Sequence, residues 1–141
     1  MSRVVVDAST ALAWCFPDET NVYADAVLVA LEGSTILVPA IWSLEVANAM
    51  LAGERRKRLG PGQVREFTRL LEGLSLIQDT QGIAENVSEV LPVARTYGLS
   101  AYDAAYLELA LRHGAPLATL DDKLEDAARR AGVGLFRAVV E

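Results

Sequence analysis

The chain has 141 residues, of which 52% are hydrophobic and 23% are charged, and its formal net charge is −6. This length and composition are those of one globular domain, spanning residues 1–141, that buries a core without disulfides. A single cysteine and a single histidine exclude an intrachain disulfide, a paired-histidine ribonuclease mechanism and a zinc site built on several histidines. There is no long apolar run or signal-peptide pattern, so we expect a cytoplasmic protein without a membrane segment.

In the first half of the chain, short apolar runs alternate with helix-like segments. The expected strands are 4–6 and 36–38, and the expected helices are 9–16, 21–32, 40–58 and 63–72. Ser9 is expected to cap the first helix, while Gly33 closes the second helix and Pro39 stops the second strand. The segment Gly60-Pro61-Gly62 is expected to break the chain between the last two helices.

The second half of the chain continues this alternation. The expected strands are 74–77, 116–119 and 135–139, and the expected helices are 83–97, 100–113 and 122–131. Short apolar strands separated by helices predict an α/β fold with a small parallel sheet of about five strands. Ligands bind to such sheets beyond the carboxyl ends of the strands.

Four acidic residues stand in apolar surroundings where a solvent-exposed acid is not expected. They are Asp7, Glu45, Asp103 and Asp121. Asp7 and Asp121 lie just past the ends of predicted strands, Glu45 lies in the helix after the second strand, and Asp103 lies in the first turn of the helix before the fourth strand. A gathered set of carboxylates is typical of a site for a hard divalent cation, here Mg²⁺ or Mn²⁺.

The first two acids also have ordinary structural interpretations. Asp7 could cap the first helix, although Ser9 in that role leaves Asp7 free to point out of the sheet. Glu45 could sit at the rim of a half-exposed helix, but a lone ionised glutamate among apolar neighbours is costly unless it is paired or binds a metal. Asn48, one helical turn after Glu45, is either a supporting residue of the site or a surface amide.

The last two acids are more ambiguous. Ser100 and Asp103 fit a capping box, in which an acid lies three residues after the capping hydroxyl. Asp121 and Asp122 form a doublet, and one of them is expected to cap the last helix. We favour Asp121 as the site residue, with Asp122 able to assist or substitute for it. Thr119 or Ser9 could add a hydroxyl to the site.

Three other residues have ordinary structural interpretations. Cys15, between Trp14 and Phe16, is predicted to be an inert buried thiol. His113 is predicted to be a helix C-terminal residue, and Glu108 to be solvated on another face of the helix that carries Asp103.

A cluster of basic residues contrasts with the acidic net charge of the chain. It comprises Arg55, Arg56, Lys57, Arg58, Arg65 and Arg69. The ordinary interpretation is a solvated face near a helix C-terminus, where cations are favourable. The functional interpretation is contact with an RNA backbone or an acidic partner, for which Arg55, Arg56 and Arg58 are the candidates.

Carboxylates gathered in one pocket repel one another. Two unit charges about 4 Å apart repel by about 4 kcal/mol at an effective dielectric constant near 20. A divalent cation removes this repulsion, can activate a water molecule and can stabilise charge on a phosphodiester. Carboxylates without histidine therefore fit metal-assisted phosphodiester hydrolysis.

Four segments together make the chain resemble a PIN domain, and more closely a VapC-type toxin of a type II toxin–antitoxin pair. They are Val5-Val6-Asp7-Ala8-Ser9, the run from Pro39 to Asn48 around Ser43-Leu44-Glu45, the run from Leu99 to Leu107 around Ala101-Tyr102-Asp103, and Leu117-Ala118-Thr119-Leu120-Asp121. The resemblance implies a sheet in the order 3-2-1-4-5 with helices on both faces. It also implies an Mg²⁺- or Mn²⁺-dependent endoribonuclease that forms homodimers and is inhibited by a small cognate antitoxin.

By position, the resemblance assigns the acidic quartet and its neighbours. Asp7, Glu45, Asp103 and Asp121 match the family's catalytic, metal-binding acids, and Ser9, Asn48 and Thr119 match positions that often support them.

Two other functions remain open from the residues alone. One is aspartyl-phosphate chemistry with Asp7 as nucleophile, which generally needs a nearby lysine such as Lys123. The other is a non-catalytic module that binds RNA or a protein.

Overall fold

Parallel strands form the centre of the molecule in a computed structural model that describes residues 2–19 and 21–137. The strands are β1 (Arg3–Val6), β2 (Thr35–Val38), β3 (Leu76–Gln78) and β4 (Leu117–Ala118), in the order β3-β2-β1-β4. Beyond β4, Leu135 forms a parallel bridge with Leu117 in place of a full fifth strand. The predicted order is confirmed, while residues 138 and 139 of the predicted last strand lie outside the described residues.

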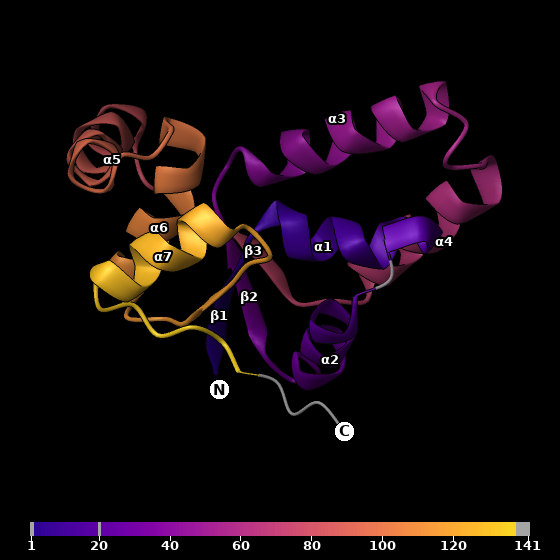
Figure 1. Cartoon of the computed structure of the whole chain (residues 1–141), viewed down its shortest axis with the longest axis horizontal. Coiled ribbons are helices and arrows are strands. Elements are labelled where there is room, and N and C mark those ends of the chain that lie inside the picture. Colours follow the sequence, from indigo (N-terminus) through magenta and orange to yellow (C-terminus); the bar gives the residue numbers. More distant parts are fainter. Residues whose placement is uncertain (1, 20, 138–141) are drawn as a thin grey trace.

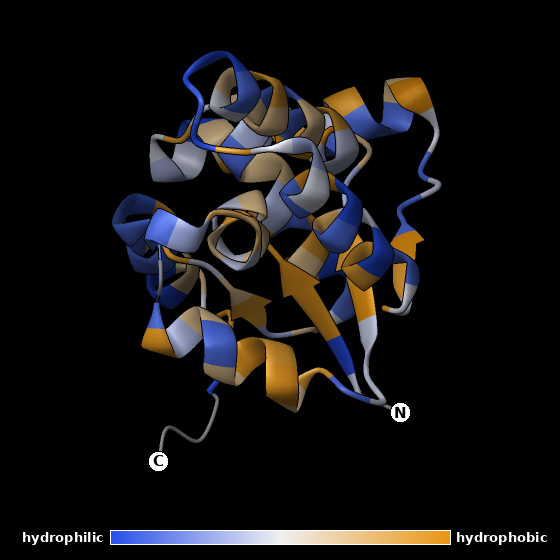
Figure 2. Cartoon of the chain, turned by 90° about the vertical axis from the view of Figure 1, so that its right-hand side faces the viewer, coloured by the Kyte–Doolittle hydropathy of each residue, from blue (hydrophilic) through white to orange (hydrophobic). Residues whose placement is uncertain are grey.

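The central strands β1 and β2 are apolar and buried, whereas the edge strand β3 is largely exposed. Val4, Val5 and Val6 have no exposed surface, and all of β2 is buried. Figure 2 shows the strands as hydrophobic arrows in the interior, surrounded by helices of mixed character. Continuous apolar runs of this kind are typical of a parallel sheet that is buried on both faces.

Helices cover both faces of the sheet, as predicted. They are α1 (Ala8–Cys15), the short 3-10 helix η1 (Pro17–Glu19), α2 (Val22–Ala30), α3 (Trp42–Arg55), α4 (Pro61–Glu72), α5 (Ile83–Tyr97), α6 (Ala101–His113) and α7 (Asp122–Arg130). Figure 1 shows α5, α6 and α7 on one side of the sheet, and α1, α2 and α4 on the other. Among the described residues, none of these helices is both long enough and apolar enough to cross a bilayer.

Two predicted helix boundaries are wrong for local reasons. Helix α3 ends at Arg55 instead of residue 58, because Lys57 adopts a φ of 60° and the amide of Arg58 turns back to the carbonyl of Gly53 at 2.8 Å. The predicted break between the two helices is present, but it ends at Gly60, so Pro61 begins α4 two residues before the predicted start at residue 63. Proline suits the first helical position, where its missing N–H removes no hydrogen bond.

Gly53 lies where α3 packs tightly against Phe16. A Cβ atom on Gly53 would lie 2.5 Å from Cε1 of Phe16 and 3.2 Å from Cδ1 of Leu59. The Phe16 ring is buried and carries the guanidinium of Arg58 at 4.3 Å from its centroid, so it has little room to move.

We therefore expect Gly53→Ala to destabilise the chain. The overpacking cost of about 1–3 kcal/mol outweighs the gain in helix propensity of about 1 kcal/mol. Urea unfolding should show a lower free energy of unfolding for this variant. The matched control is Gly62→Ala in α4, where the new Cβ has no neighbour nearer than 4.0 Å and the stability should stay the same or rise. A stabilised Gly53→Ala variant would contradict this packing.

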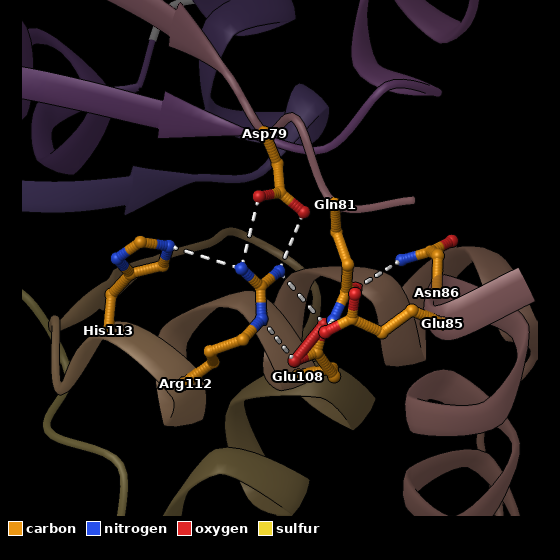
Figure 3. Close-up of polar contacts among 7 residues, drawn as sticks. All are labelled: Asp79, Gln81, Glu85, Asn86, Glu108, Arg112 and His113. Carbon is orange, nitrogen blue, oxygen red and sulfur yellow. Dashed lines mark hydrogen bonds and ion pairs between the residues drawn. The ribbon is translucent and has the colours of Figure 1, made fainter. Parts of the chain in front are cut away.

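Arg112, in the last turn of α6, ties this helix to the segment after β3 (Figure 3). It donates to both carboxylate oxygens of Asp79 at 3.1 and 2.6 Å, and to both of Glu108 at 2.9 and 3.1 Å. Glu108 is buried, so the prediction that it is solvated is wrong. The reason is that α6 packs against the sheet, α5 and α7, which leaves few of its central residues exposed.

The predictions for the lone cysteine and histidine are confirmed. Cys15 is a free, buried thiol, and burial together with the charge of Glu19 raises its pKa to about 11. His113 is the last residue of α6, followed by Gly114 in the left-handed conformation.

Candidate metal-binding site

Asp7 lies at the carboxyl end of the central strand β1, where the chain passes directly into α1. Its amide donates to the carbonyl of Ala118 at 2.9 Å, which continues the sheet pairing up to this residue. Asp7 is the N-cap residue of α1, although its side chain makes no capping hydrogen bond. The prediction that Ser9 caps this helix is therefore wrong, because Ser9 already lies inside it.

Two hydroxyl groups hold the Asp7 carboxylate. Ser9 Oγ and Thr119 Oγ1 each donate to Oδ2 of Asp7 at 2.7 Å. Ser9 also accepts from the amide of Leu120 at 3.1 Å, and Thr119 accepts from the amide of Asp121 at 3.0 Å. These bonds join the ends of β1 and β4. Both hydroxyls predicted to belong to the site therefore contact the Asp7 carboxylate directly.

The charge on Asp7 is unfavourable in this position. The side chain is buried, and this burial raises its pKa above the usual range, with repulsion from Asp121 acting in the same direction. The hydrogen bonds from Ser9 and Thr119 oppose the shift without cancelling it. A buried, ionised carboxylate that carries such a cost is stabilised by a nearby cation.

The acidic doublet separates into two different environments. Asp121 is the N-cap residue of α7, where its Oδ1 accepts from the amide of Leu124 at 2.9 Å, and its charge acts on Asp7 and Asp103. Asp122 is exposed and lines a neighbouring pocket with Tyr23. This arrangement favours Asp121 over Asp122 as the member of the acidic cluster.

Asp103 combines a capping position with a place in the cluster. Its amide donates to Oγ of Ser100, the N-cap residue of α6, at 3.1 Å. Burial raises the pKa of its carboxyl group, and repulsion from Asp121 and Asp7 adds to the shift, while Ser100 and Lys123 oppose it. The capping box and the functional interpretation are therefore compatible, since the amide serves the cap and the carboxylate faces other acids.

Glu45, in the first turn of α3, is paired with Tyr106 from α6. The tyrosine hydroxyl donates to Oε1 of Glu45 at 2.5 Å. Burial raises the pKa of Glu45, the bond from Tyr106 lowers it, and repulsion from Asp7 and Asp103 raises it further. Sequence reasoning did not single out Tyr106, although its position three residues after Asp103 places it on the same face of the helix.

The four carboxylates come from separate segments and act on one another electrostatically. In the described part of the chain, however, no three histidine, cysteine or acidic side chains are close enough together to form a metal site by themselves. An all-oxygen donor set suits Mg²⁺ or Mn²⁺, and Mg²⁺ usually binds through one or two carboxylates and keeps several waters. The residues therefore fit the implied cation.

The remaining candidate residues lie at the periphery. Asn48 is exposed, and its side chain has no hydrogen-bond partner among the described residues. Arg55 and Arg56 are exposed at the end of α3. Arg58 is instead held by Asp18 at 2.8 Å and Glu19 at 2.9 Å, so contact with a phosphate would have to displace these carboxylates.

Comparisons with known proteins agree with this fold. Residues 4–130 match the PIN domain model. Ribonuclease VapC3 of Pyrobaculum aerophilum is 32% identical over 125 residues, covering 88% of this chain and 93% of that protein. The crystal structure of PAE2754, also from Pyrobaculum aerophilum, has a TM-score of 0.67 at 27% identity, covering 89% of this chain and 79% of that one. The chain belongs to the PIN domain family.

A more distant structure shows how widely the fold is shared. The structure of VapBC2 from Rickettsia felis, bound to a DNA fragment from their promoter, has a TM-score of 0.67 at 13% identity. It covers 95% of this chain and 97% of that one, and at this identity it shows the common fold alone. The family resemblance seen in the four sequence segments is confirmed.

Proposed function

We propose that this chain is a metal-dependent endoribonuclease, the toxin of a toxin–antitoxin pair, which hydrolyses RNA phosphodiester bonds. The observation that carries the proposal is that four carboxylates from separate segments gather near the carboxyl ends of β1 and β4, where Thr119 bonds to Asp7 and where burial and the neighbouring acids raise the pKa values of Asp7, Glu45 and Asp103. The similarity to a protein named Ribonuclease VapC3 supports ribonuclease activity.

In this proposal each acidic residue has a role at the cation. Asp7, Glu45, Asp103 and Asp121 hold Mg²⁺ or Mn²⁺. Ser9 and Thr119 fix the Asp7 carboxylate through their two hydrogen bonds to Oδ2. Asn48 and Asp122 lie at the margin, where they can contact waters or RNA.

The bound cation supplies Lewis-acid stabilisation of the phosphodiester and activation of the attacking water. The residues of the chain supply orientation and a negative potential. Because burial and mutual repulsion make the ionised Asp7, Glu45 and Asp103 unfavourable, the site favours a divalent cation over a neutral ligand.

We further propose that residues 1–141 form a single domain that acts in the cytoplasm. We also propose the partners that the family resemblance implies. A cognate antitoxin inhibits the chain, and Arg55 and Arg56 contact RNA or the antitoxin. The chain forms a homodimer, for which an apolar groove between α3 and α5 is a candidate surface. Its rim includes Leu44, Ile83 and Val87, which are exposed. Sedimentation of the purified chain distinguishes a dimer from a monomer.

Removal of the metal tests the proposed activity. We expect the purified, antitoxin-free chain to cut RNA with Mg²⁺ or Mn²⁺, to lose cleavage in EDTA and to regain it when excess Mn²⁺ is added, because in this proposal activation of the attacking water depends on the cation. Gel analysis of a panel of transfer, ribosomal and messenger RNAs measures this. Undiminished cleavage in EDTA would contradict metal dependence. A folded chain that binds RNA without cutting it would favour a binding module.

A further inference from the structure

A buried tyrosine joins two of the helices that carry the acidic cluster. Tyr106, one turn after Asp103 on α6, has no exposed surface. Its hydroxyl donates to Oε1 of Glu45 on α3 at 2.5 Å, across 61 positions of sequence. The contact therefore links the position of Glu45 to the helix that carries Asp103.

The need to satisfy a tyrosine hydroxyl does not explain this pairing. Tyr23, which is half-buried, donates to the backbone carbonyl of Phe136 at 2.8 Å. A neutral carbonyl oxygen satisfies a hydroxyl without placing a charge in a partly buried setting, whereas burying a carboxylate costs free energy unless it is compensated. The carboxylate partner of Tyr106 therefore indicates that the orientation of Glu45 itself matters.

The two side chains differ in their freedom to move. Glu45 is partly exposed, so its long side chain can adopt several rotamers. Tyr106 has a rigid ring fixed by the core around it. A hydrogen bond from the rigid partner restricts the flexible one, and it engages Oε1, which leaves Oε2 for another partner.

We propose that Tyr106 is a positioning residue, whose hydroxyl holds Oε1 of Glu45 so that this carboxylate is oriented to bind a divalent cation. The inference rests on the proposed function, since it concerns the same site. Tyr106 acts through Glu45, in the way that residues hydrogen-bonded to a metal ligand orient that ligand.

The test is Tyr106→Phe, which removes one oxygen atom and keeps the ring. We expect Mn²⁺ to bind the RNA-free protein about tenfold more weakly, since loss of a partner that orients a ligand costs roughly 10–100-fold in metal affinity. Calorimetric titration measures the affinity, and thermal unfolding in EDTA verifies the fold. The matched control is Tyr23→Phe, which also removes a phenolic hydrogen bond and should bind Mn²⁺ like the wild type.

A double-mutant cycle separates positioning from a general loss of structure. In a Glu45→Ala background, which removes the acceptor that Tyr106 contacts, adding Tyr106→Phe should weaken Mn²⁺ binding by less than about twofold, because residues that act through one contact are not additive. Equal losses in both backgrounds would overturn the inference. Glu45→Asp, which keeps the charge but draws it away from the hydroxyl, should lose affinity by a similar factor, and wild-type affinity in this variant would also overturn it.

The outcomes distinguish this inference from the proposed function. If the wild type binds Mn²⁺ and cuts RNA while Tyr106→Phe binds Mn²⁺ equally well, the inference alone is overturned. If the wild type neither binds Mn²⁺ nor cuts RNA, the proposed function fails and the inference falls with it.

Discussion

Asp7→Asn is expected to reduce RNA cleavage by at least about 100-fold while the chain stays folded. The substitution removes the charge at the centre of the acidic cluster, and the expected loss exceeds the roughly 10–100-fold typical of residues that merely orient a ligand. The asparagine oxygen can still accept the hydrogen bonds that Ser9 and Thr119 donate to Oδ2. Cleavage rates with saturating Mn²⁺ measure the effect.

The stability of the same variant should move in the opposite direction. Because the pKa of Asp7 is raised in the folded chain, its contribution to stability is present below about pH 4 and is lost as pH rises through the folded-state pKa. At pH 7 in EDTA, the neutral asparagine should therefore leave the unfolding temperature equal to or above that of the wild type. Asp25→Asn, at an exposed acid of α2, is the control and should change neither property. Full activity in folded Asp7→Asn would contradict the proposed site.

Arg112→Met is expected to lower the free energy of unfolding by about 3 kcal/mol. The variant leaves Glu108, with 6% of its side chain exposed, and Asp79, with 12%, without their common partner. Breaking a buried ion pair costs about 3–5 kcal/mol, and we expect the low end because the side chain of Arg112 is 29% exposed. Thermal unfolding should show a midpoint roughly 6–12 °C lower.

A surface pair provides the comparison. Arg129 pairs with Glu125 at 2.6 Å on α7, with 58% of its side chain exposed, so Arg129→Met should cost no more than about 0.5 kcal/mol. Equal losses for the two variants would contradict the structural role of Arg112.

The effect of Arg112→Met should also depend on pH. Burial acts to raise the pKa of Asp79, but the hydrogen bonds and the charge of Arg112 outweigh it and hold the pKa below its usual range. The stabilisation is therefore present above about pH 4 and is lost as pH falls through the folded-state pKa. The difference in stability between the wild type and Arg112→Met should shrink in this acidic range, and a constant difference would contradict the pairing with Asp79.

Helix ends and N-cap residues are predictable from local sequence only where they do not depend on contacts with distant segments. Helix α5 has the predicted bounds of 83–97, because its end is set locally by Gly98, which follows it in the left-handed conformation. The N-cap of α1 is Asp7 instead of Ser9, since the position of the cap depends on how far β1 pairs with β4. The same pairing brings Thr119 to Asp7 across 112 positions.

The sequence by itself indicated a parallel α/β sheet and four acids as the candidate site, because apolar runs and isolated charges are visible residue by residue. Four motif segments indicated the family, and the expected strand order came from that resemblance. Only the tertiary structure decided that Glu108 is buried, that Arg112 holds Asp79, that Arg58 is held by Asp18, and that Asp121 lies nearer the cluster than Asp122. It also revealed Tyr106 as the partner of Glu45. Each of these depends on packing between segments distant in the sequence, and the spacing of residues along one segment carries no information about which other segment it will contact.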